Sequence, residues 1–237
     1  MSRLEKTFIV DQVSRVVHWQ REYRWLADLG VVAPIVAHFR CGTGESTLGL
    51  MWAVQGREGV GLDMDEPLLQ TGRDRLEQLK WEMEAMWERL RVSESLPTAE
   101  FMWWNDGVPN FLKHNLLDDT FSLDFRIGGL PSNNPLEYEA YDLVFCDMVL
   151  NEIWWDRSRE DAEEETRVAI GQMARLVRPG GYLAAFEWVE QKFRPRLDFQ
   201  LLFEQLQLEV SHAEEVRLDN WRGRGQAAGF LCQKILY

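Results

Sequence analysis

The sequence has little positive charge. Lys and Arg together number 26 against 39 Asp and Glu, which leaves a formal net charge of −13, and the basic residues form no cluster. Because a surface of this sign repels phosphate groups, we expect no direct binding to nucleic acid or to an anionic membrane. A small-molecule substrate, especially a cationic one, fits this charge better.

Cysteines and long apolar runs are also scarce. The three cysteines, Cys41, Cys146 and Cys232, are far apart and odd in number, which is typical of a reducing compartment. No metal-ligand spacing links them, so we expect no metal site. The longest apolar run, Leu48–Val54, is far too short to span a bilayer. We therefore expect a cytoplasmic protein without a membrane segment.

The apolar content is sufficient for a core. With 237 residues, 46% of them hydrophobic, the chain suits one α/β domain with insertions. We expect an N-terminal helical extension over residues 1–30 and a main domain over residues 31–237 with an insertion near 119–140. In the extension, apolar spacing predicts a helix from Asp11 to Leu29 that ends at Gly30.

A βαβ unit is predicted near the start of the main domain. An apolar segment, Ile35–Phe39, is followed by a turn with Gly42 and Gly44, an amphipathic segment, and a second apolar segment, Gly59–Asp63. Glycine lets the backbone turn sharply and approach a ligand, and the N–H groups that begin the helix favour an anionic group. Asp63 would end the second strand, where a carboxylate can accept hydrogen bonds from a ribose diol.

The glycine spacing distinguishes two ligand classes. A dinucleotide fold requires G-x-G-x-x-G, but Thr47 stands at the third glycine position, which weakens the hypothesis of an NAD-linked oxidoreductase. The phrase Cys41-Gly42-Thr43-Gly44, followed after 19 residues by Asp63, resembles motif I and the acidic second-strand end of class I S-adenosylmethionine-dependent methyltransferases. The chain departs from that family at His38, where many members have an acid, and at Arg40, where they have the first glycine.

The resemblance implies a fold and a cofactor. The fold would be a Rossmann-like, seven-stranded, mostly parallel sheet with a C-terminal antiparallel strand pair and helices on both faces. S-adenosylmethionine would be the cofactor. Its implied contacts are Arg40, Cys41, Gly42, Gly44, Asp63, Met64, Asn115, Leu116, Asp147 and Met148. Met64 and Leu116 would face the adenine, Asn115 would accept from its amino group, and Asp147 and Met148 would lie beside the methionine portion.

Further segments support this assignment. A long amphipathic helix is predicted from about Asp65 to Leu90, and a strand over Val108–Leu116 would present Asn115, with Asp118 as the other candidate for the adenine contact. Tyr141–Asp147 is a near-continuous apolar run, typical of a central buried strand, and resembles motif IV.

The second half of the chain contains breaks and a closing pair of strands. Thr120–Ala140 is predicted to be an irregular connection because glycine, proline and asparagine interrupt it. Arg178–Gly181 resembles the turn by which these methyltransferases enter their fifth strand. Leu208–Glu214 and Ala227–Leu236 are predicted as two strands joined by the polar stretch Val216–Gln226.

Four residues are candidates for contacts to the methyl acceptor. By resemblance, Asn151 and Glu152 would border the space where the methyl group leaves. Trp155 is suited either to caging a cation or aromatic ring, or to packing against a helix. Tyr23, on the N-terminal helix, is suited either to facing a pocket or to a partly solvated position. Glu187 is a further candidate for orienting a substrate.

Two functions follow from these residues. The first, which the resemblance implies, is direct methyl transfer from the sulfonium to a small-molecule acceptor, with cationic and aromatic molecules as the candidates. The second is a catalytically inactive, methyltransferase-like scaffold or partner subunit, which the residues His38, Arg40 and Asn115 motivate. A homodimer is a further expectation, and the acceptor atom is not determined by the sequence.

Overall fold

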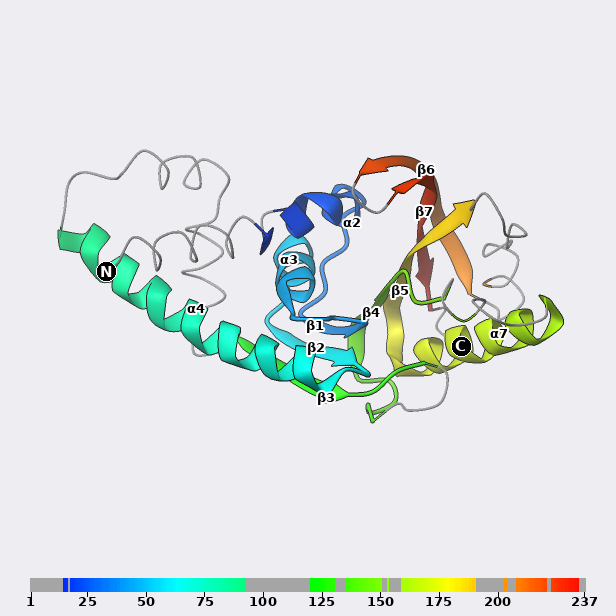
Figure 1. Cartoon of the computed structure of the whole chain (residues 1–237). Helices are drawn as coiled ribbons and strands as arrows, with labels where there is room; N and C mark the ends of the chain where they lie inside the picture. The colour runs from blue at the N-terminus through cyan, green and yellow to red at the C-terminus, as the bar shows by residue number, and fades with distance from the viewer. Residues whose placement is uncertain are drawn as a thin grey trace. The chain divides into compact units, whose positions relative to one another are not determined.

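The computed structural model describes residues 15–16, 18–92, 120–130, 135–150, 153, 159–190, 203, 208–220 and 223–234 (Figure 1). By contacts, the chain divides into two units. The first unit comprises Met1–Pro34 and Cys41–Arg126, and the second comprises Ile35–Arg40 and Ile127–Tyr237. The described residues of the N-terminal extension thus belong to the first unit.

The described strands form one sheet. They are β1 (Ile35–Phe39), β2 (Glu58–Asp63), β3 (Ser122–Ile127), β4 (Tyr141–Asp147), β5 (Val177–Glu190), β6 (Glu209–Asn220) and β7 (Gly223–Gln233). In hydrogen-bonding order they run β3-β2-β1-β4-β5-β7-β6. β4 pairs in parallel with β1 and β5, whereas β7 pairs antiparallel with β5 and β6. Parallel strands with a closing antiparallel pair confirm the predicted fold class.

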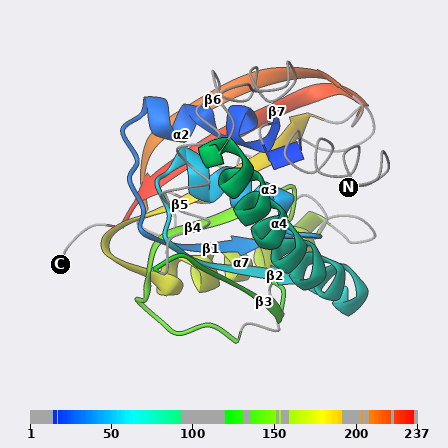
Figure 2. The same ribbon diagram turned by 90° about the vertical axis from the view of Figure 1, so that its left-hand side faces the viewer.

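Three labelled helices belong to the first unit: α2 (Arg24–Asp28), α3 (Glu45–Ala53) and α4 (Glu66–Val92). α3 and α4 contact β2, and α2 contacts α3 (Figure 2). α4 begins one residue after Asp65, whose Oδ1 accepts a hydrogen bond from the Leu68 N–H at 3.2 Å. The predicted N-terminal helix is confirmed for the described residues, except for a turn at Tyr23 before α2.

The second unit is built on β4. Every residue of this strand is buried, as the apolar run predicted, and α7 (Arg159–Leu176) packs on β4 and β5. Asp142 on β4 is also buried, because two partners satisfy its carboxylate: its Oδ2 accepts from the Ile35 N–H at 2.8 Å, and its Oδ1 pairs with Arg178. Gly180, in the predicted Pro-Gly-Gly turn, has a φ of +78°.

Two predicted connections are wrong. β3 lies inside the stretch that we expected to be irregular, and its apolar residues Leu123, Phe125 and Ile127 alternate with the period of a strand. At the C-terminus, most of the polar stretch Val216–Gln226 is strand, since β6 extends to Asn220 and β7 begins at Gly223. Main-chain hydrogen bonds between antiparallel strands do not require apolar side chains, which explains why hydrophobicity did not reveal them.

Candidate functional site

The loop between β1 and α3 has the sharp turn that its glycines predicted. Gly42 has a φ of +55° and Gly44 a φ of +86°, both in the left-handed region. Gly44 is the residue before α3, and its N–H donates to the Cys41 carbonyl at 2.9 Å. The loop therefore reverses within a few residues and leads directly into the first turn of the helix.

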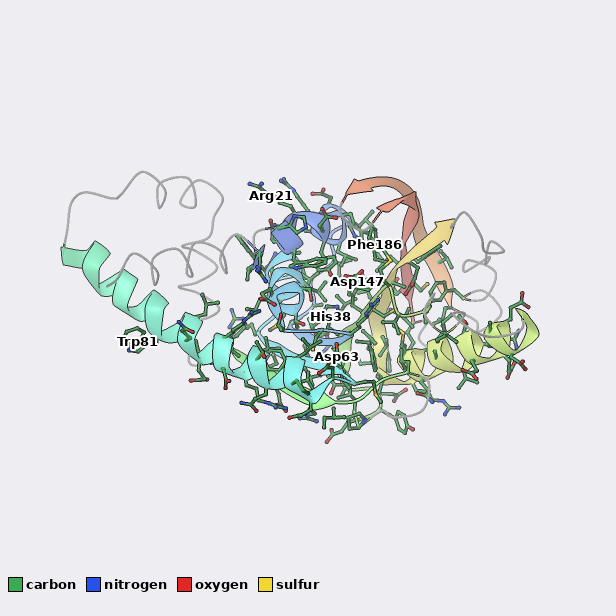
Figure 3. The ribbon with its side chains drawn as sticks, viewed as in Figure 1. Arg21, His38, Asp63, Trp81, Asp147 and Phe186 are labelled. Carbon is green, nitrogen blue, oxygen red and sulfur yellow. The ribbon has the colours of Figure 1, made fainter. Side chains whose placement is uncertain are left out.

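Asp63, at the end of β2, holds this loop (Figure 3). Its Oδ2 accepts from the Gly42 N–H at 2.9 Å, and its Oδ1 accepts from the Asp65 N–H at 3.0 Å. The Cys41 N–H adds a bond to the Leu62 carbonyl at 2.9 Å. A carboxylate oxygen can accept two hydrogen bonds, so Asp63 keeps accepting capacity for hydroxyl groups of a ligand.

The two glycines of the loop differ in their surroundings. A Cβ at Gly42 would meet no atom within 4 Å, whereas a Cβ at Gly44 would lie 2.5 Å from the ring of Phe125. The same ring lies 3.2 Å from the corresponding position at Gly61 and 3.3 Å from that at Gly72. Gly44 is thus required by packing, while Gly42 leaves open space in which a ligand can approach the backbone.

The first turn of α3 carries a buried acid. Glu45 accepts from the Arg75 Nη1 at 2.6 Å and lies 3.8 Å from the Arg15 Nη1. Thr43 also donates its hydroxyl to this carboxylate. A small cleft lies beside these groups, with apolar side chains of α3 and α4 on its other walls. The two arginines balance the charge of Glu45. Its carboxylate lies in the first turn of α3, where the helix dipole favours a negative charge.

In the second unit, the turn after β4 is fixed by main-chain and side-chain bonds. Asp147 ends the strand and is buried, and Met148 follows with a φ of +58° (Figure 3). The Met148 N–H donates to the Phe186 carbonyl at 2.8 Å, and the Met148 carbonyl accepts from the Arg40 Nη1 at 2.8 Å. The Arg40 guanidinium thus links the end of β1 to the turn after β4.

Glu187 on β5 has a different role from the one the sequence indicated. Its side chain is 0% exposed, so the prediction that it faces a substrate is not supported by its burial. Its Oε1 accepts from the N–H groups of Val149 at 3.0 Å and Leu150 at 2.9 Å. The Cys146 Sγ lies 3.5 Å from the same oxygen, and burial, reinforced by the charge of Glu187, raises the pKa of this thiol.

Comparisons with known proteins identify the fold. No protein-family model and no curated protein matches the chain, but many solved structures do. One of them is an S-adenosylmethionine-dependent methyltransferase of Methanosarcina mazei, which is 11% identical to this chain. The match covers 87% of this chain and 94% of that chain, with a TM-score of 0.55. The chain has the class I methyltransferase fold.

Two further structures with this methyltransferase fold cover most of the chain. A putative methyltransferase of Haloferax volcanii, in complex with the Trm112 methyltransferase activator, is 14% identical over 92% of this chain and 91% of that one, with a TM-score of 0.56. The magnesium protoporphyrin IX methyltransferase of Synechocystis, with bound S-adenosylmethionine, is 14% identical. The match covers 99% of this chain and 85% of that chain, with a TM-score of 0.54.

The predicted adenine contact stays a prediction, because the segment that would make it lies outside the described residues. Among the described residues, the strand next to β2 is β3, which begins at Ser122. Asn115 and Asp118 precede this strand in the sequence and were predicted at the end of a separate strand. The residues that follow its end are Gly128 and Gly129. The predicted strand Val108–Leu116 and the predicted contact residues Asn115, Leu116, Asn151, Glu152 and Trp155 lie outside the described residues.

The other predicted contact residues have mixed surroundings. Met64 is 64% exposed, as a residue available to a ligand would be. Cys41 is buried, and burial, with a smaller contribution from the charge of Asp63, raises the pKa of its thiol. Tyr23 is only 1% exposed and stacks on Trp19, with ring centroids 5.5 Å apart. The expectation that Tyr23 is partly solvated is therefore wrong.

The described part of the chain contains neither a group of metal ligands nor a membrane-spanning helix. There, no group of three or more His, Cys, Asp and Glu residues is arranged to hold a metal ion. None of the helices described is both long and apolar enough to cross a membrane.

Proposed function

We propose that this protein is an S-adenosylmethionine-dependent methyltransferase that acts on a small-molecule acceptor. The observation that carries this proposal is the loop of Gly42, which is held by the Asp63 carboxylate at 2.9 Å and has open space where a Cβ would stand. A nucleoside can bind where the backbone is fixed, where there is open space beside Gly42, and where a carboxylate ends the nearby strand β2.

The described residues of this site fit the cofactor chemically. Asp63 would accept from the ribose hydroxyls, since each of its oxygens keeps a lone pair after bonding one backbone N–H. Gly42 would allow close approach of the backbone, and Met64 offers a soft, exposed side chain for the adenine. When bound, S-adenosylmethionine supplies a methyl group that its sulfonium makes electrophilic.

The protein's own part in the reaction would be to orient the acceptor and exclude water. The transferred group is already reactive, so alignment of the two reactants contributes most of what the chain must add. The net charge of −13 favours a neutral or cationic acceptor. Asn151, Glu152 and Trp155 remain our predictions for the acceptor side, and Asp147 and Met148 for the methionine portion; the burial of Tyr23 does not support it as an acceptor contact.

A second candidate function is a methyltransferase-like partner subunit. Arg40 replaces the first glycine of motif I, and its guanidinium holds the Met148 carbonyl at 2.8 Å, at a turn that we assign to the cofactor. If this contact persists, it competes with ligand for that carbonyl. The Haloferax neighbour, which is in complex with an activator protein, is an example of such a fold in a two-protein assembly.

Calorimetric titration with S-adenosylhomocysteine separates these functions. We expect wild-type protein to bind and Asp63→Ala to bind at least about tenfold more weakly, because a hydrogen bond to a charged group contributes about 1.5–3 kcal/mol. Asp74→Ala, which removes an exposed carboxylate from α4, should bind like wild type. Absence of heat at millimolar ligand with folded wild-type protein would favour the partner subunit, and binding of NAD instead would favour an oxidoreductase.

A further inference from the structure

Glu187 is a carboxylate enclosed by the protein. It lies on β5 directly after Phe186, which stands opposite Asp147 in the parallel pairing of β4 and β5. Its side chain is 0% exposed. Removing a carboxylate from water is unfavourable unless hydrogen bonds compensate it, so the groups that bond to Glu187 show what this residue does.

Three donors to one oxygen of Glu187 lie around the turn after β4. Two consecutive backbone N–H groups, those of Val149 and Leu150, donate to its Oε1 at 3.0 and 2.9 Å. The buried Cys146 Sγ lies 3.5 Å from the same oxygen. These donors flank Asp147 and Met148 in the sequence. A single carboxylate oxygen therefore accepts from a thiol just before the end of β4 and from two backbone N–H groups just after it.

The same turn is held from a second direction. Arg40 donates from its Nη1 to the Met148 carbonyl at 2.8 Å. Both residues have a left-handed backbone conformation, with a φ of +63° for Arg40 and +58° for Met148. Residues other than glycine rarely adopt this conformation. Such conformations persist where neighbouring bonds enforce them. Glu187 accepts from the N–H groups of the turn, and Arg40 donates to its carbonyl.

We infer that Glu187 is a positioning residue of the cofactor site, which fixes the Met148–Leu150 turn with Arg40 as the opposing contact. The inference rests on the proposed function, because its consequence is that the turn is prepared for the cofactor before the cofactor arrives. Because its side chain is 0% exposed, Glu187 would act through the turn and not by direct contact with cofactor or acceptor.

Two substitutions of Glu187 test this role. Glu187→Ala removes the acceptor of both N–H groups, whereas Glu187→Gln keeps an oxygen that can accept them. The matched control is Glu137→Ala, because Glu137 is an exposed acid on the connection before β4. Two quantities are measured on each folded variant: hydrogen exchange of the amides of Val149 and Leu150, and the affinity for S-adenosylhomocysteine by calorimetry.

We expect Glu187→Ala to exchange these amides at least about tenfold faster and to lose about tenfold in affinity, a loss equal to about 1.4 kcal/mol. Glu187→Gln should restore most of both quantities, and Glu137→Ala should change neither. Partial rescue by the amide is a result that a merely space-filling role would not give. An affinity and exchange pattern in Glu187→Ala equal to those of wild type would overturn the inference.

Arg40→Leu gives an independent test if Glu187→Ala does not fold, because the Arg40 side chain is exposed. The expected result is again faster exchange around Met148 and weaker binding. Tighter binding by Arg40→Leu would identify this arginine as an obstruction and overturn the positioning role. If wild-type protein binds no S-adenosylhomocysteine, the proposed function fails, and the exchange rates in Glu187→Ala alone decide between a fixed and an unfixed turn.

Discussion

At the scale of single residues, His38 shows how burial changes the chemistry of a side chain. It stands on β1 where related methyltransferases often have an acid, it is 0% exposed, and its ring centroid lies 5.3 Å from that of Phe145. Burial lowers the pKa of His38 to about 3, so the imidazole is neutral in the folded protein at pH 7. This neutral ring therefore packs as part of the core.

The lowered pKa predicts a loss of stability in acid. Between pH 6.5 and about 3 the unfolded chain binds a proton at His38 and the folded protein does not, so the free energy of unfolding falls as the pH falls through this window. The loss from this site should approach about 1.4 kcal/mol per pH unit. Urea unfolding between pH 6.5 and 4.5 measures it, with wild type compared with His38→Leu.

The control for this comparison is His18→Gln, because His18 is exposed. That variant should follow the pH dependence of wild type, while His38→Leu should show a shallower one. Parallel curves for wild type and His38→Leu would contradict a buried, neutral His38.

At the scale of elements, three glycines accommodate one aromatic ring. Phe125 of β3 lies against Gly44 at the start of α3, Gly61 of β2 and Gly72 of α4. A side chain at any of these glycines would come closer to the ring than ordinary van der Waals contact allows. The ring therefore limits how closely the loop of Gly42 and Gly44 can approach β2 and α4. The packing at Gly44 thus depends on a residue 81 positions later in the chain.

Gly44→Ala should destabilise the first unit. A left-handed φ costs a residue other than glycine about 1–2 kcal/mol, and overpacking against Phe125 adds about 1–3 kcal/mol. We expect a loss of at least about 2 kcal/mol in the free energy of unfolding, measured by urea denaturation.

The matched glycine for this experiment is Gly171, which lies within α7 and has no atom within 4 Å of its Cβ position. Gly171→Ala should be neutral or stabilising by up to about 1 kcal/mol, because alanine favours a helix interior. An equal loss in both variants would mean that the ring of Phe125 does not constrain Gly44.

At the scale of the whole molecule, net charge limits the partners. The excess of 13 negative charges at pH 7 produces a long-range field that repels polyanions. Because phosphate contacts supply most non-specific affinity for DNA, the chain should not bind duplex DNA at about 0.1 M salt. This property is set by composition and does not depend on how the elements are arranged.

A gel-shift titration of labelled duplex DNA measures this prediction. We expect no shift at any protein concentration that leaves the protein soluble, over a range of salt concentrations. A shift that weakens as salt rises would reveal a basic surface that the overall charge conceals.

The sequence by itself determined the local elements and the fold class. β1, β2 and β4 were predicted within about one residue, since each is marked by its own apolar pattern. The same local signals located the glycine loop and Asp63, the two parts of the candidate site that are adjacent in the structure.

Only the tertiary structure decided the pairings between distant residues. β3 was missed because the glycine, proline and asparagine residues that follow it obscured its own alternating pattern, and its pairing with β2 is visible only in the tertiary structure. Glu187 was assigned to a substrate because nothing near it in the sequence shows that the amides of Val149 and Leu150 enclose it. Burial and hydrogen bonding arise from contacts far along the chain, and these convert an apparently reactive acid into a support for the turn.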